Sequence, residues 1–216
     1  MRSWRQPPPA EEFDRREIPV PVVGEAGLAG PWFRLYRVAF ANQFHASTGS
    51  RLTPASGEFP CCYLGASVET TVAEVWGDRL AAHRDQGGNP YVITTGQARE
   101  WAFLRVARLP DDLKMCDLTD AETLLRAGLD AATLYATDLS LPRMWAERIA
   151  RHPAGFDGIR YLSRHNHQPC LVLWERPGRP DPLSNRLVFE PAGEFLDSEA
   201  AHRLAGKIGI RLAFSW

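Results

Sequence analysis

Three polar residues stand where the surrounding sequence predicts ordered structure. Arg37 interrupts the apolar run Leu35–Phe40, Glu74 lies on a predicted helix, and Ser163 closes the segment Phe156–Leu162. An arginine can bind an anion through its guanidinium group. A fixed carboxylate can stabilise the positive charge that develops on a sugar when a glycosidic bond breaks. Each residue also has an ordinary structural explanation, which must be weighed beside the chemical one.

Two arginines are candidate anion ligands. Arg37 lies in a predicted strand, Phe33–Phe40, where it either reaches water from an edge or is a buried cation that holds an anion. Phosphate would favour the second alternative, because its oxygens pair with the guanidinium fork. Arg51 lies in a long predicted loop, Asn42–Gly57, and follows a glycine and a serine. It is either solvated or set beside backbone N–H groups that approach an anion.

Glu74 lies on a helix predicted to begin near Val68 and to end near His83, with Ser67 as N-cap. Its apolar stripe contains Val68, Val72, Val75, Trp76 and Leu80, nearly opposite Glu74. The glutamate is therefore either solvated or lines a cleft, where its carboxylate would bind a ribose hydroxyl. The helix follows a predicted strand, Pro60–Gly65, in which Tyr63 either fills the core or offers its ring face to an aromatic ligand.

Composition is ordinary for a water-soluble globular protein. The 216 residues carry a formal net charge of −1, so nothing calls for direct nucleic-acid binding or an anionic membrane. No apolar run reaches the length of about 18 residues that a membrane helix needs, and the first nine residues are polar and proline-rich. We therefore expect a cytoplasmic protein. The four cysteines follow no disulfide or zinc spacing, and Cys61-Cys62 is expected to fill a strand.

Strands and helices intermingle without regular alternation, which favours an α+β fold in a single domain. Residues 1–30 are rich in proline and predict an extended arm that does not pack. Residues 31–178 form the predicted domain that contains the three polar residues, and residues 179–216 a C-terminal extension packed on it. Further strands are expected at Tyr91–Thr95, Trp101–Leu109, Gly158–Leu162, Cys170–Glu175 and Leu187–Glu190, and further helices after Thr119, after Ser140 and around Ser198–Lys207.

The order of these residues and their flanks resembles the RES domain family, which is named for Arg, Glu and Ser. The similarity begins at Leu35-Tyr36-Arg37-Val38 and Gly49-Ser50-Arg51, and continues through Tyr63-Leu64-Gly65-Ala66-Ser67 and Thr71-Val72-Ala73-Glu74. It resumes at Asp117-Leu118-Thr119-Asp120, at Trp145-Ala146 and at Phe156-Asp157-Gly158-Ile159-Arg160-Tyr161-Leu162-Ser163, and ends at Leu171-Val172-Leu173-Trp174.

The resemblance implies an ADP-ribosyltransferase-like fold with split, mixed and antiparallel sheets flanked by helices. It implies that Glu74, Arg37 and Ser163 are catalytic and that Arg51, Tyr63 and Tyr36 bind substrate. The substrate would be NAD, which is cleaved at the nicotinamide N-glycosidic bond with water or inorganic phosphate as acceptor, and no cofactor would be bound permanently.

The resemblance also implies a bacterial toxin held inactive by a helix-turn-helix antitoxin of the Xre type. Transfer of ADP-ribose to a protein, and a non-catalytic module that only binds the antitoxin, are the alternatives. The sequence leaves the acceptor and the oligomeric state open, a homodimer included. Leu52 stands where many relatives have an aromatic residue after the arginine. The segment Trp101–Lys114 and the C-terminal extension have no recognisable counterpart in the family.

Overall fold

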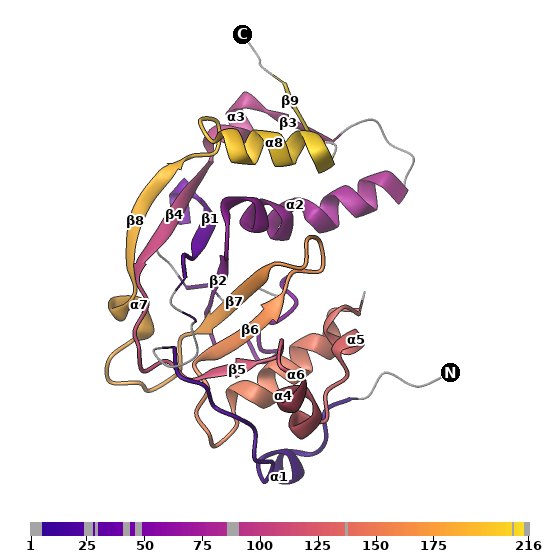
Figure 1. Cartoon of the computed structure of the whole chain (residues 1–216), viewed down its shortest axis with the longest axis vertical. Coiled ribbons are helices and arrows are strands. Elements are labelled where there is room, and N and C mark those ends of the chain that lie inside the picture. Colours follow the sequence, from indigo (N-terminus) through magenta and orange to yellow (C-terminus); the bar gives the residue numbers. More distant parts are fainter. Residues whose placement is uncertain are drawn as a thin grey trace.

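The computed structural model describes residues 6–23, 28, 30–40, 44–45, 49–85, 91–136, 138–208 and 210–213. Seven strands form one mostly antiparallel sheet in the order β5-β6-β7-β2-β1-β4-β8, and β3 and β9 form a separate parallel pair (Figure 1). Residues 42–43 and 46–48 of the predicted 42–57 loop lie outside the described residues, as do residues 86–90, 209 and 214–216. The fold is α+β, as the sequence predicts.

The strands and helices are defined as follows. The strands are β1 Phe33–Arg37, β2 Cys61–Gly65, β3 Tyr91–Thr94, β4 Trp101–Arg108, β5 Met115–Asp117, β6 Gly158–Leu162, β7 Pro169–Trp174, β8 Val188–Glu194 and β9 Ile210–Ala213. The helices are α1 Ala10–Phe13, α2 Val68–Asp85, α3 Thr95–Arg99, α4 Ala121–Ala127, α5 Ala131–Leu134, α6 Ser140–Ala150, α7 Leu183–Arg186 and α8 Glu199–Ile208. A 3₁₀ turn, Val38–Phe40, follows β1.

The large sheet is divided between β1 and β2. These two strands are paired at a single position, Phe33 with Gly65, whereas β1 pairs along its whole length with β4 and β2 along its whole length with β7. Beyond that pair β1 and β2 separate, so the sheet consists of two halves joined at one point. At Cys61, where β2 is no longer paired with β1, the edge of β2 forms an isolated β-bridge with His45.

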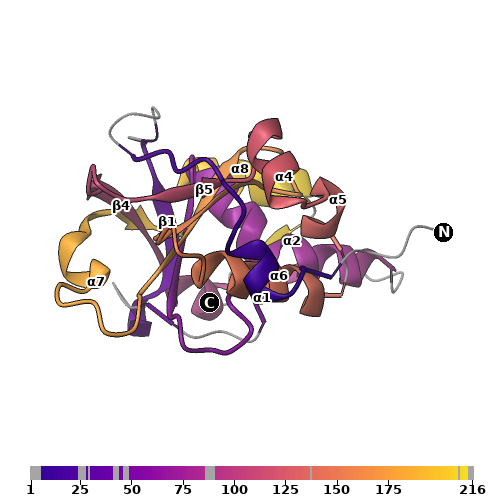
Figure 2. The same ribbon diagram turned by 90° about the horizontal axis from the view of Figure 1, so that it is seen from below.

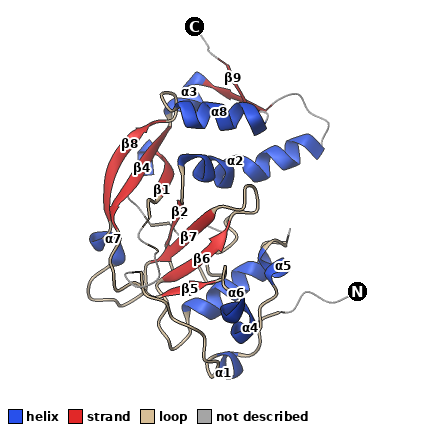
Figure 3. Ribbon diagram, in the orientation of Figure 1, coloured by secondary structure: helices blue, strands red, loops and turns tan. Residues whose placement is uncertain are grey.

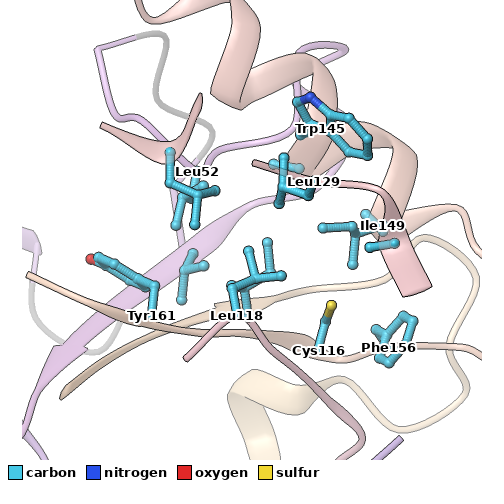
Figure 4. Close-up of a cluster of buried hydrophobic side chains, with 14 of the residues drawn as sticks. Leu52, Cys116, Leu118, Leu129, Trp145, Ile149, Phe156 and Tyr161 are labelled. Carbon is cyan, nitrogen blue, oxygen red and sulfur yellow. The ribbon is translucent and has the colours of Figure 1, made fainter. Parts of the chain in front are cut away.

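Strict alternation along β2 and β7 places their side chains in two cores. Cys61, Val172 and Trp174 face a cluster covered by α4, α5 and α6, and Cys62 and Leu173 face a second cluster on the other side of the sheet. Figure 4 shows the first cluster, in which Trp145 and Ile149 of α6 lie over Leu118, Cys116 and Phe156. All four cysteines are buried and free, so Cys61-Cys62 fills a strand as predicted.

The third core joins α2 to the C-terminal part of the chain. Val72 and Trp76 of α2 are buried against Phe195 and Ala201, and α8 packs on α2 (Figure 3). The Ser67 hydroxyl accepts a hydrogen bond from the Thr70 amide, which confirms the predicted N-cap of α2. The side chains of 78–85, including that of Leu80, lie outside the described residues.

The N-terminal segment is packed, contrary to the prediction of an arm that does not pack. Phe13 is fully buried and its ring meets Trp145 edge-on, and Val23 donates a backbone hydrogen bond to Leu113. In Figure 2, α1 lies beside α6. The many prolines disfavour regular structure, but they do not prevent the apolar side chains between them from packing. The sequence prediction did not take the packing of those side chains into account. The segment predicted as a C-terminal extension contains β8, which pairs with β4, α8, which packs on α2, and β9, which pairs with β3.

One predicted boundary is wrong for a local reason, and the start of a predicted helix is defined by its N-cap. The strand predicted over Phe33–Phe40 ends at Arg37, because the backbone then turns into the 3₁₀ turn and leaves β4. The helix predicted after Thr119 begins at Ala121, because the Asp120 carboxylate accepts the cap hydrogen bond from the Thr123 amide. No helix within the described ranges is long and apolar enough to cross a membrane.

Candidate functional site

A cavity of about 620 Å³ opens where β1 and β2 separate. Its wall includes five of the six residues predicted from the sequence: Tyr36, Arg37, Arg51, Tyr63 and Glu74. They come from β1, the loop before β2, β2 itself and α2, which are far apart in the sequence. The volume falls in the range of about 300–1,000 Å³ that is typical of small-molecule sites.

Both carboxylate oxygens of Glu74 accept hydrogen bonds from β6 and its end. The Tyr161 hydroxyl donates to Oε2 at 2.8 Å, and the Ser163 hydroxyl donates to Oε1 at 2.6 Å. Burial, and next the negative charge of Glu74, raise the pKa of Tyr161 well above its ordinary value, so the phenol stays protonated and donates. The carboxylate is therefore held in one orientation on the cavity wall.

Ser163 lies behind Glu74 and does not itself line the cavity. Its side chain is fully buried, and its hydroxyl oxygen accepts a hydrogen bond from the His165 amide at 3.2 Å. The Ser163 amide in turn donates to the Gln168 carbonyl at 2.8 Å. Since the hydroxyl has one proton, which goes to Glu74, the serine positions the glutamate and is not placed to attack a substrate.

Arg37 occupies the rim of the cavity at the end of β1. Its side chain is exposed, and its guanidinium lies over the ring of Trp101 at 5.4 Å from the centroid. Of the two alternatives left by the sequence, the structure shows the arginine that reaches water, and not the buried cation. The side chain nevertheless borders the cavity. Arg34 lies three residues earlier in β1, so its side chain is on the opposite face of the strand. It is the buried arginine of β1, and it lines the same cavity.

Arg51 is anchored to the turn after α5. Its Nη1 donates to the Leu134 carbonyl at 3.2 Å and to the Ala136 carbonyl. Burial lowers the pKa of Arg51, while the nearby Glu74 carboxylate opposes that shift. The guanidinium remains charged at neutral pH, because arginine begins from a very high value. Arg51 thus brings a fixed positive charge to the side of the cavity that contains Glu74.

Tyr63 is held by the same loop. Its hydroxyl shares a hydrogen bond with the Thr53 hydroxyl at 2.9 Å, and burial raises its pKa, so it remains a neutral phenol. The loop is fastened to α6, because the Ser56 amide and hydroxyl both donate to the Glu147 carboxylate. The part of the predicted long loop that is described is therefore ordered by α6.

The structure adds residues that the sequence prediction missed. Tyr161 is a direct partner of Glu74, and the period of two along β6 puts it on the same face as Ser163, so this signal was available. His165 lines the cavity and lies against α2 at Gly77, where a Cβ would stand 2.5 Å from both ring nitrogens. Burial lowers the pKa of His165, which keeps its imidazole neutral near pH 7.

The charged side chains on the cavity wall are mostly positive. Four arginines line it (Arg34, Arg37, Arg51 and Arg164), and within the described wall Glu74 is the one carboxylate. This arrangement suits a ligand with at least two negative charges. Cys61 also lines the cavity, but burial raises its pKa to about 12, so its thiol is a poor nucleophile. No set of three or more metal-binding side chains occurs in the described part of the chain.

Comparison with known proteins agrees with the geometry. The family model of the RES domain matches residues 30–193. This range includes Trp101–Lys114 and β8, for which the sequence reading found no counterpart. A chain of the crystal structure of the M. tuberculosis MbcT–MbcA toxin–antitoxin complex is similar in fold, with a TM-score of 0.52 and 18% identity over 76% of this chain and 84% of that chain.

No curated protein sequence gives a significant match. At 18% identity the structural likeness concerns the fold, but the family model spans three quarters of the sequence with the Arg, Glu and Ser positions inside it. The chain therefore belongs to the RES domain family.

Proposed function

We propose that the protein is an enzyme that degrades NAD by cleaving the bond between nicotinamide and ribose. The observation that carries the proposal is the Glu74 carboxylate, fixed by Tyr161 and Ser163 on the wall of an arginine-lined cavity. The arginines offer partners for the diphosphate. The carboxylate is oriented to stabilise positive charge on the ribose ring, which is greatest in the transition state.

The proposed reaction needs one bond to break and one to form. The C1′–N bond breaks, its electron pair stays with nicotinamide, and the ribose gains oxocarbenium character beside Glu74. Water or phosphate then adds to C1′, and the attacking group loses a proton to solvent. Because nicotinamide leaves as a neutral molecule, no acid is needed to protonate it. This agrees with a cavity whose described wall contains one carboxylate and not two.

The test is to incubate the purified protein with NAD, with and without phosphate, and to measure nicotinamide. Release with water yields ADP-ribose, and release with phosphate yields its 1″-phosphate, so the product identifies the acceptor. Glu74→Gln is expected to lower the rate by about 10²-fold or more with folding intact, as for loss of one preorganised electrostatic group. Absence of nicotinamide release by the wild-type protein under both conditions would refute the proposal.

We further propose that the protein is the toxin of a toxin–antitoxin pair, with an Xre-type helix-turn-helix protein as antitoxin. The support is membership of the RES family together with a fold like that found in a toxin–antitoxin complex. Expression of the chain alone should arrest bacterial growth, and co-expression of a helix-turn-helix protein encoded beside it should relieve the arrest.

Labelling of a protein by NAD tagged on adenine, with little free ADP-ribose, would instead favour ADP-ribose transfer.

A further inference from the structure

His45 lines the cavity at the opposite end of β2 from Gly65. Its amide donates to the Cys61 carbonyl at 3.1 Å, and its carbonyl accepts from the Cys61 amide at 2.8 Å. This pair of hydrogen bonds closes the free edge of β2 where β1 has moved away. The backbone of His45 is therefore fixed, and its side chain contributes to the cavity wall.

The strand register places His45 far from the proposed reacting centre. Gly65 and Tyr161 both pair with Cys170 of β7, so Tyr161, which holds Glu74, is level with Gly65. Cys61, the partner of His45, lies four residues away along β2, which is about 13 Å at 3.3 Å per residue. The cavity thus extends along β2 from Glu74 at one end to His45 at the other.

The imidazole of His45 has an unsatisfied ring nitrogen. Its Nε2 is buried and has no hydrogen-bond partner among the described residues. A buried polar atom of this kind is destabilising unless a hydrogen-bond partner is supplied. The ring of Phe40 meets the imidazole edge-on, with 5.5 Å between centroids and an angle of 85°. Phe40 also lines the cavity, and 47% of its surface is exposed, so its ring is open to a ligand.

We propose that His45 and Phe40 form the subsite for the second base of the dinucleotide, the adenine that takes no part in the chemistry. The inference rests on the proposed function and adds to it a residue that selects the substrate. A planar heterocycle can pack on the Phe40 ring while one of its edge atoms hydrogen-bonds to His45 Nε2. The distance of about 13 Å along β2 between Gly65 and Cys61 leaves room for a molecule with one base at each end.

The test compares two substrates that share the scissile bond: NAD, and nicotinamide mononucleotide, which lacks the adenosine half. His45→Phe keeps a ring and removes the nitrogens. It should raise the KM for NAD about five- to tenfold with kcat nearly unchanged, because the bond is made equally in the ground and transition states. Cleavage of nicotinamide mononucleotide should not change. Wild-type protein should prefer NAD, and the variant should lose most of that preference.

The matched control is His202→Phe. His202 also has a buried, unpartnered Nε2 and lies beside a phenylalanine, Phe195, but it is not part of the cavity wall. This variant should retain the wild-type preference for NAD. Equal loss on both substrates in His45→Phe would assign His45 a structural role and overturn the proposal. Unchanged kinetics would also overturn it, because the nitrogen would then be satisfied by water.

A binding measurement separates this inference from the proposed chemistry. Adenosine monophosphate carries the base and one phosphate and has no bond to cleave, so its affinity can be measured by calorimetry whether or not NAD is consumed. Wild-type protein should bind it at least five times more tightly than His45→Phe. If the wild type cleaves NAD but the two proteins bind adenosine monophosphate equally, the subsite is wrong and the proposed function stands. If the wild type does not cleave NAD but the affinity difference is found, the opposite holds.

Discussion

The orientation of Glu74 depends on a short chain of hydrogen bonds from β6 and the turn that follows it. The His165 amide donates to Ser163, and Ser163 and Tyr161 donate to the two carboxylate oxygens. A carboxylate with both oxygens engaged cannot rotate freely, so it does not have to reorganise when charge develops beside it. The serine in the family name thus contacts the glutamate and does not line the cavity in this protein.

Tyr161→Phe tests the importance of that orientation. The variant keeps the ring in the core and removes one donor to a charged acceptor, a bond worth about 1.5–3 kcal/mol. If the bond counts mainly in the transition state, kcat for NAD should fall roughly 10- to 100-fold while KM stays within a factor of two. Steady-state kinetics and thermal denaturation of the variant supply the comparison. A change confined to KM would contradict the expected role.

Five of the six predicted site residues lie on one cavity wall, but the geometry that brings them together could not be predicted. Tyr36, Arg37, Arg51, Tyr63 and Glu74 surround one cavity, as required if they act together. Their catalytic and binding roles stay predictions. Residues such as Arg34, His45 and Trp101 carry no local signal, because they reach the cavity through the separation of β1 from β2 and through the pairing of β4 with β1.

Helix α2 carries Glu74 and has a glycine, Gly77, where the His165 side chain packs closely against it. Gly77 lies one turn after Glu74, and the His165 imidazole occupies the space that a Cβ would need. Glycine in the middle of a helix is unfavourable by about 1 kcal/mol relative to alanine. Its presence here is explained by the close approach of His165, which lines the cavity next to Glu74.

Gly77→Ala should therefore separate stability from activity. The helix should gain or retain stability, but the methyl group should displace the imidazole toward the cavity and lower kcat/KM for NAD about tenfold or more. Activity of Gly77→Ala combined with His165→Ala should equal that of His165→Ala alone, since the clash is then absent. A double variant that is still less active than His165→Ala would mean that α2 itself is distorted.

Elements with a strong local pattern were predicted well, and those without one were missed. The nearly continuous apolar runs of β2 and β7 and the apolar face of α6 are visible in sequence and recur in the structure. β5 has three residues and forms by parallel pairing with β6, from which it is separated by forty residues, so no local signal defines it. The end of β1 is likewise set by the course of the chain after Arg37.

The two ends of the chain complete different cores. Phe13 from the N-terminal segment enters the cluster around α6, and Phe195 from the C-terminal extension enters the cluster around α2. The second contact is the closer to the site, because the Phe195 ring lies 4.9 Å from Trp76, and Trp76 in turn meets Trp101, over which Arg37 lies. A row of aromatic rings therefore connects the C-terminal extension with the rim of the cavity.

A pair of matched substitutions tests this difference. Phe13→Ala and Phe195→Ala each remove a fully buried phenylalanine, and each should lower the free energy of unfolding by about 3–5 kcal/mol. The folded fraction of Phe13→Ala should keep its kcat/KM for NAD, because Phe13 contacts Trp145 and His152, which do not line the cavity. Phe195→Ala should lose activity per folded molecule, because α2 and Trp101 lose their support.

Urea titration gives the folded fraction, and assays below the transition give the rate. Equal specific activities in the two variants would show that the C-terminal extension stabilises the fold without positioning the site.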